Sequence, residues 1–121
     1  MLTVETHRIG DLKIAELTSD HLIINTAGDG LDLLGNLYYQ GFDKMIVYAK
    51  NIAPDFFDLK NGMAGELLQK FSTYRMGLAI VGNLDAYNSK SLHDFIYESN
   101  QMGHTIFVNT VSEALILLSG L

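Results

Sequence analysis

Apolar and polar residues alternate one by one at the start of the chain. The alternation divides the side chains between two faces, Val4, Thr6 and Arg8 on one and Glu5, His7 and Ile9 on the other. Gly10-Asp11 is a turn signal, and apolar residues return directly after it. A period of two on both sides of a glycine turn is typical of a β-hairpin, which we predict over residues 3–17.

Further along, apolar residues recur every three or four positions, which indicates amphipathic helices. The predicted helices lie near 28–40, near 59–75, near 88–101, and from Thr110 to the end, where Thr110 and Glu113 form a capping box. Short continuous apolar runs separate them and predict buried strands near 44–49, 77–82 and 104–108. Residues 21–25 are short and extended, or a packed connection.

Strands that are apolar on both sides and alternate with helices predict a parallel sheet covered by helices on both faces. The order is β-β-α-β-α-β-α-β-α, with the first strand as an antiparallel edge. The fold class is therefore α/β, a mixed and mainly parallel sheet of about five strands with an N-terminal edge hairpin and four helices. No linker divides residues 1–121, so we expect a single domain.

Composition narrows the function classes. The chain has no cysteine, which excludes thiolate nucleophiles and cysteine-ligated zinc and is typical of a reducing compartment. Eight Lys and Arg against fourteen Asp and Glu give a net charge of −6, which disfavours nucleic acid as a partner. The first residues do not have the pattern of a signal peptide, and the apolar runs are too short to span a membrane. We expect a cytoplasmic protein.

One segment resembles a known family. Residues 55–71, together with 74–75, 78–82 and 94–100, resemble an uncharacterised bacterial family, domain of unknown function 4180. The resemblance covers roughly residues 29–118 and implies no activity, because the function of the family is unknown.

The order of elements is also similar to the STAS domain, the fold of anti-sigma factor antagonists. In that family a serine at the start of a helix is phosphorylated to switch partner binding. The corresponding stretch here, Asp58 to Gly62, contains no hydroxyl side chain, and none occurs before Ser72. The resemblance therefore implies the architecture and a regulatory role, but not the phosphoswitch.

No motif in the chain indicates catalysis, a cofactor or a metal. The four histidines have no metal-ligand spacing, and no G-x-S-x-G elbow occurs. Gly28-Asp29-Gly30 precedes a helix, but Leu33 stands where a dinucleotide-binding turn needs its third glycine. We expect no catalytic residues, no cofactor and no bound zinc or iron.

The candidate binding surface lies where the second predicted helix begins, near the carboxyl ends of the strands, where α/β sheets bind ligands. It comprises Asp55, Phe56, Phe57, Asp58, Lys60, Asn61, Gly62, Met63, Asn83 and Asp85. Asp58 is equally suited to capping the helix. Phe56 and Phe57 are expected to form a buried cluster in the loop; if the loop is extended instead, they cannot both face one core, so one would anchor the loop and the other would meet a partner. Gly62 and Gly65 suggest close backbone contact.

Two hypotheses follow. The first is a non-enzymatic regulatory or protein-interaction module of STAS-like fold, whose partner protein is unidentified; it leaves homo-oligomer formation open. The alternative is a small-ligand-binding protein or an enzyme that uses a crevice formed by Lys50, Asp55, Asp58, Asn83 and Asp85. A pocket with convergent polar groups favours the alternative, whereas a flat apolar patch around Phe56 and Met63 favours the module.

Overall fold

A five-stranded sheet forms the centre of the protein, whose computed structural model describes residues 2–120. The strands are β1 (Thr3–Ile9), β2 (Leu12–Thr18), β3 (Lys44–Tyr48), β4 (Gly77–Val81) and β5 (Thr105–Val108). They lie side by side in the order β1-β2-β3-β4-β5. β1 and β2 are antiparallel, and every other pair is parallel. The predicted fold class and the parallel arrangement of the last three strands are confirmed.

The N-terminal hairpin turns in two residues, Gly10 and Asp11, as the alternation predicted. Gly10 has a φ of +59°, which glycine adopts without strain and which a two-residue hairpin turn requires. The tight turn pairs Ile9 with Leu12 and, further along, places Glu5 directly opposite Glu16.

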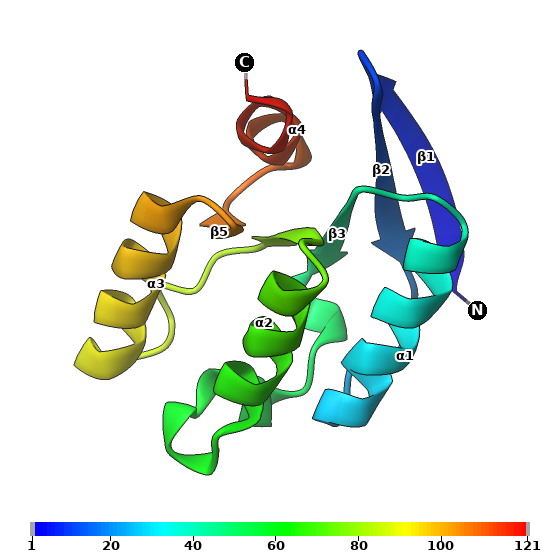
Figure 1. The fold of residues 1–121 in the computed structure, drawn as a ribbon. Coiled ribbons are helices and arrows are strands. Elements are labelled where there is room, and N and C mark those ends of the chain that lie inside the picture. The colour runs from blue at the N-terminus through cyan, green and yellow to red at the C-terminus, as the bar shows by residue number, and fades with distance from the viewer. Residues whose placement is uncertain (1, 121) are drawn as a thin grey trace.

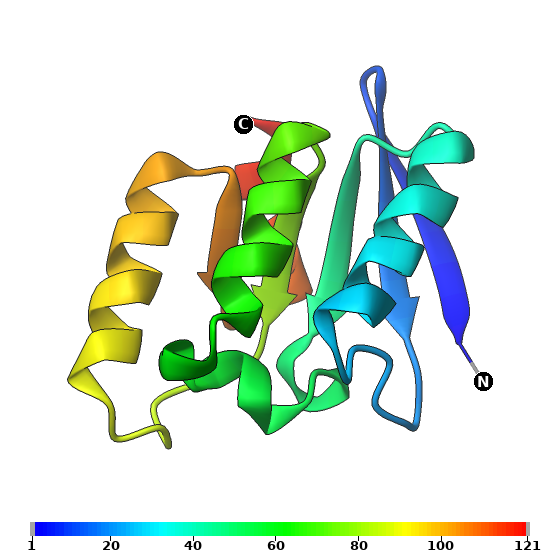
Figure 2. The ribbon, with the colours of Figure 1, turned by 60° about the horizontal axis from the view of Figure 1, so that its bottom comes forward.

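The helices form two unequal layers on the sheet. They are α1 (Ala27–Tyr39), α2 (Met63–Thr73), α3 (Lys90–Met102) and α4 (Val111–Ser119). α1, α2 and α3 cover one face, and α4 alone lies on the other (Figure 1, Figure 2). Each crossover advances one strand in the same direction, and crossovers are right-handed, so their helices share a face. Helices therefore cover both faces, as expected.

Two hydrophobic clusters stabilise these layers. The larger lies under α1, α2 and α3 and includes Met45, Leu67 and Phe71. The smaller lies under α4 and includes Ile46 and Ala114. α4 packs mainly on β3, β4 and β5. On this face Ile14 of β2 joins its cluster, whereas Glu5 and Glu16, farther along β1 and β2, lie outside it. No helix among residues 2–120 has both the length and the apolar character to cross a membrane.

The predicted helix near 59–75 is shorter than expected. Three 3₁₀ turns precede it, η1 (Ala49–Asn51), η2 (Pro54–Phe57) and η3 (Leu59–Asn61), and α2 begins at Met63. Gly62 separates η3 from α2 because its φ of +78° is incompatible with a continuous right-handed helix. Of residues 21–25, only Ile24 pairs, as an isolated bridge to Ile52, so the packed connection is the observed form.

Candidate functional site

The long connections of the protein gather at one end of the strands, which forms the carboxyl edge of the parallel part of the sheet. Residues 19–26, 49–62 and 82–89 follow the carboxyl ends of β2, β3 and β4, whereas residues 40–43, 74–76 and 103–104 link helices back to strands at the opposite edge. Figure 2 shows the long connections together beyond the arrowheads of the strands. Binding residues in α/β folds concentrate on such loops, so this edge is the candidate functional site.

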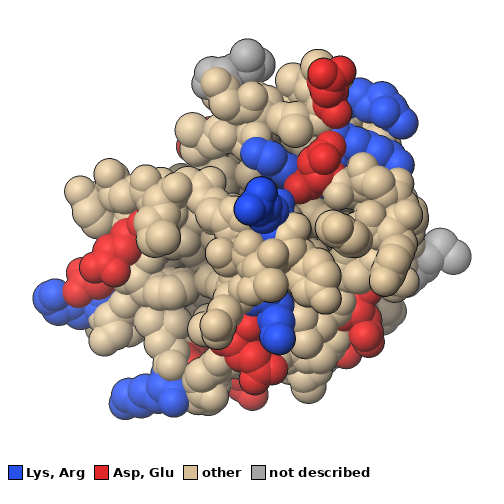
Figure 3. Space-filling model, viewed as in Figure 1, with Lys and Arg blue, Asp and Glu red and all other residues tan. Residues whose placement is uncertain are grey.

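Figure 3 shows the opposite side, which in Figure 1 presents the carboxyl ends of α1 and α2. Basic and acidic side chains are interspersed there among wide uncharged areas. The visible face of the described residues thus carries no continuous patch of one sign, the surface feature that would steer a highly charged partner.

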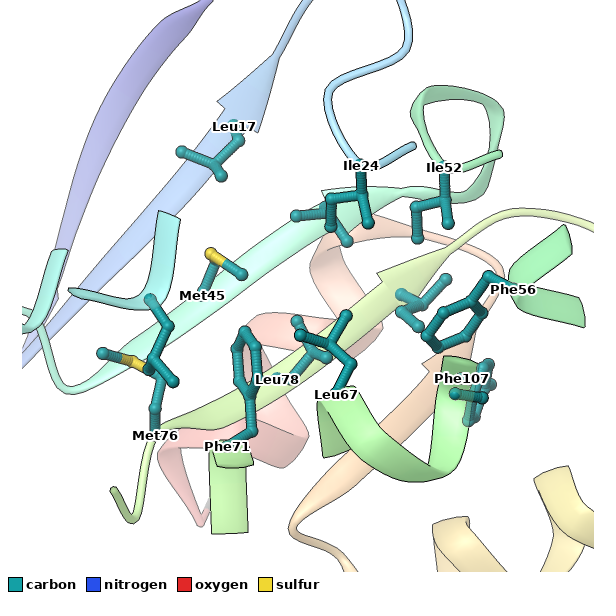
Figure 4. Packing of buried hydrophobic residues seen from close by; sticks show 14 of the residues in the cluster. Leu17, Ile24, Met45, Ile52, Phe56, Leu67, Phe71, Met76, Leu78 and Phe107 are labelled. Atoms are coloured by element: carbon teal, nitrogen blue, oxygen red, sulfur yellow. The ribbon is translucent and has the colours of Figure 1, made fainter. Parts of the chain in front are cut away.

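Phe56 and Phe57 are both buried, at 1% and 4% exposure. The 3₁₀ turn of η2 brings their rings 5.1 Å apart, edge to face. Figure 4 shows Phe56 within the cluster that also contains Ile52 and Leu67. The expected buried cluster is confirmed. The alternative, in which one ring faces a partner, is wrong, because it required an extended loop and η2 is a 3₁₀ turn. The apolar patch that would favour the interaction module is therefore missing from these two residues.

The polar residues of the predicted surface are exposed, but several hold the loop together. Asp58 accepts a hydrogen bond from the backbone N–H of Lys60, so it caps η3 rather than α2. Asn61 donates to the carbonyl of Asp55 at 2.7 Å and accepts from the N–H of Met63 at 2.9 Å. These bonds give the segment a defined shape and occupy the side-chain amide of Asn61 and one carboxylate oxygen of Asp58.

The remaining predicted residues are divided between two hollows or lie outside both. A hollow of about 480 Å³ between η2, η3 and the start of α3 includes Asp58 and Lys60. A second, of about 320 Å³, lies at the carboxyl ends of β4 and β5 and includes Asp85. Asp55, Asn61, Gly62, Met63, Asn83 and Lys50 line neither. The predicted crevice is thus not one site.

The second hollow has the more varied polar lining. His93 and Tyr97 lie one turn apart on α3, opposite Asp85 in the loop after β4, and Asn109 follows β5. All four side chains are exposed, whereas Phe107 in the floor is buried. Asn100 fixes the wall by bonding both the N–H and the carbonyl of Phe107, at 2.7 and 3.1 Å. His93, Tyr97 and Asn100 of α3 were absent from the predicted site, because the register of α3 against β5 cannot be read from spacing.

A second polar cluster was missed altogether. On the face of the sheet that α4 leaves open, His7 Nε2 lies 2.8 Å from Glu16 Oε1 and 3.1 Å from Glu5 Oε2. Tyr48 of β3 donates its hydroxyl to the other oxygen of Glu16. Burial, followed by the Glu16 hydrogen bond and charge, raises the pKa of Tyr48 to about 12. The two-residue turn at Gly10-Asp11 was the available signal, because it sets Glu5 opposite Glu16.

Comparison with known proteins identifies a family. The sequence model of the family described as Domain of unknown function (DUF4180) matches residues 9–118. No curated protein and no solved structure matches the chain. The resemblance to that family is confirmed, and the similarity to STAS domains stays a prediction from the order of elements.

Proposed function

We propose that this chain, which belongs to the DUF4180 family, is a ligand-binding domain that holds a small polar molecule at the carboxyl ends of β4 and β5. One observation carries the proposal. The hollow lined by Asp85, His93, Tyr97 and Asn109 brings exposed polar groups from three segments together over an apolar floor. Such a combination, at this edge of an α/β sheet, is typical of small-molecule sites.

The lining residues define the class of ligand. The Asp85 carboxylate accepts hydrogen bonds, while His93, Tyr97 and Asn109 can each donate and accept. Ile96 and Phe107 offer an apolar surface beneath them. A volume of about 320 Å³ is at the lower end for ligand sites. These properties suit a metabolite with a small apolar body and hydroxyl or amino groups, rather than a lipid or a polymer.

Protein-observed NMR with amines, amino acids and nucleosides as probes tests the proposal. Probes of the fitting class should shift the amide signals of Gly82, Asp85 and Asn109 together. His93→Ala should raise the dissociation constant obtained from these shifts about tenfold, because losing one polar contact costs roughly 1.4 kcal/mol. The control is His21→Ala, an exposed histidine in the connection before α1. If no probe moves these signals, or both variants respond alike, the hollow is not a binding site.

The protein-interaction module is the second candidate. It is favoured by the connection 49–62, which is long and yet well structured, with three 3₁₀ turns. Connections between strands and helices usually take 2–6 residues, and a longer ordered one is commonly functional. Its exposed charges at Asp55, Asp58 and Lys60 would then contact the partner protein.

Charge reversal at Lys60 tests this second candidate. Lys60→Glu should reduce recovery of the partner from lysate of the source cells, because it reverses the charge of one of the two lysines in the 49–62 connection, the one that lies beside Asp58. It should keep the melting temperature within about 2 °C of that of the native chain. Lys60 is exposed, and its hydrogen bond to Asp58 uses the backbone N–H, which the substitution keeps. Arg8→Glu, exposed on β1, is the matched control. Equal recovery with both variants would remove this surface from consideration.

A further inference from the structure

The cluster on the open face of the sheet combines three metal-ligating side chains. Glu5 and His7 lie two residues apart on β1, so they point to the same face, and Glu16 on β2 pairs with Glu5 across the ladder. One ligand atom from each of the three lies within 4.8 Å of the others. Two carboxylate oxygens and an imidazole nitrogen therefore converge on a single position.

An ion pair alone accounts poorly for this convergence. His7 Nε2 carries at most one hydrogen, yet both Glu16 Oε1 and Glu5 Oε2 lie within hydrogen-bond distance of it. Within residues 2–120, no lysine or arginine forms an ion pair with either carboxylate. Two carboxylates that approach each other repel unless a cation, either a protonated His7 or a metal ion, lies between them. A divalent ion would neutralise both and use the nitrogen lone pair.

Tyr48 adds support from outside the three ligands. Its hydroxyl bonds Glu16 Oε2, which orients the carboxylate so that Oε1 faces His7. Metal-ligating carboxylates are commonly held in this way by a hydrogen bond from a neighbouring side chain. Phenol, carboxylate and imidazole thus come from three adjacent strands rather than from a mobile loop.

The surroundings leave one side of the cluster accessible. The side chain of Glu16 is 12% exposed, that of His7 22% and that of Glu5 66%, so burial decreases from the centre of the sheet toward its edge. α4 packs mainly on β3, β4 and β5 and reaches Ile14 of β2, so solvent reaches the cluster from the side of Glu5 and His7. Three protein ligands with an open side match sites in which water completes the coordination.

We propose that Glu5, His7 and Glu16 bind one divalent transition-metal ion, and that Tyr48 is the positioning residue for Glu16. Mixed nitrogen and oxygen ligands suit zinc, manganese or ferrous iron, whereas calcium and magnesium prefer oxygen alone. We expected no bound zinc or iron because the histidines lack metal-ligand spacing. That spacing does not detect ligands that the hairpin brings together from two strands. The proposal is independent of the hollow at β4 and β5.

Calorimetric titration with zinc chloride tests the proposal on tag-free protein stripped with a chelator. The native chain should bind about one zinc ion and gain thermal stability from it, because the ion binds only the folded state. Glu16→Gln and His7→Ala should lose this binding and the gain in melting temperature. Tyr48→Phe should bind roughly 10-fold to 100-fold more weakly, as expected for an orienting hydrogen bond. Magnesium should give no comparable signal.

Two variants keep the outcome decisive. Glu98→Gln changes an exposed glutamate on α3 and should bind zinc like the native chain. Glu5→Gln alters the most exposed ligand, so it decides the matter if a more buried variant fails to fold. Zinc binding that is absent from the native chain overturns the proposal. So does binding that survives unchanged in Glu5→Gln, because the ion would then occupy another surface histidine.

Discussion

Tyr48 donates its hydroxyl to Glu16 from the neighbouring strand, and the burial of this hydroxyl together with the bond should make the stability of the protein sensitive to alkaline pH. Burial first, and Glu16 second, raise the pKa of Tyr48 from 10.0 to about 12. The folded chain therefore holds the phenolic proton more tightly than the unfolded chain does. The stability that depends on the protonated Tyr48 hydroxyl is fully present below the pKa of the unfolded chain. It is lost as the pH rises through the pKa of the folded chain.

Thermal unfolding as a function of pH tests this property of Tyr48. The native chain should lose melting temperature between about pH 10 and pH 12, and Tyr48→Phe should flatten that part of the decline. Tyr39→Phe is the control, because that ring is 89% exposed. Parallel curves for all three proteins would contradict the assigned role of Tyr48, and measurements with chelator present separate it from metal binding.

At the scale of elements, the contact between α1 and α2 depends on one glycine. A Cβ on Gly30 would lie 2.5 Å from Leu67 Cδ1, and Leu67 is itself buried at 1% exposure. Close backbone contact was expected instead at Gly62 and Gly65, and this expectation is wrong. A Cβ on either would meet nothing within 4 Å, and Gly62 is required instead for its positive φ. Spacing reveals a glycine in a helix but not which face meets a neighbour.

Two alanine substitutions in the same helix should have opposite effects on the free energy of unfolding. Gly30→Ala should lower it by about 1–3 kcal/mol, because the methyl group overpacks the contact with Leu67. Gly35→Ala meets open space and should raise it by up to about 1 kcal/mol, through helix propensity. Urea unfolding measures both. Equal destabilisation would mean that α1 packs on α2 in another way.

For the whole molecule, patterns local in sequence predicted the fold well. Alternation gave the hairpin, and apolar runs gave the three parallel strands, because burial on both faces leaves a signature within each segment. The candidate site was predicted less well. A partner-facing ring at Phe56 or Phe57 was considered because the loop could be extended, whereas η2 is a 3₁₀ turn. Glu16 meets Tyr48 only through the pairing of β2 with β3, a contact between distant segments that no local pattern contains.

The two borders of the sheet differ in whether they can recruit another strand. Along β5, Asn100 bonds both outward groups of Phe107, and Ser99 donates to the carbonyl of Thr105, so side chains of α3 occupy that border. Among residues 2–120, β1 is the last strand at the other border, and no further strand pairs with its outer side. Strand addition between copies thus has one docking border per molecule. Pairing two molecules through β1 uses the β1 border of each. This mode of assembly therefore closes at a symmetric pair and cannot grow into a filament.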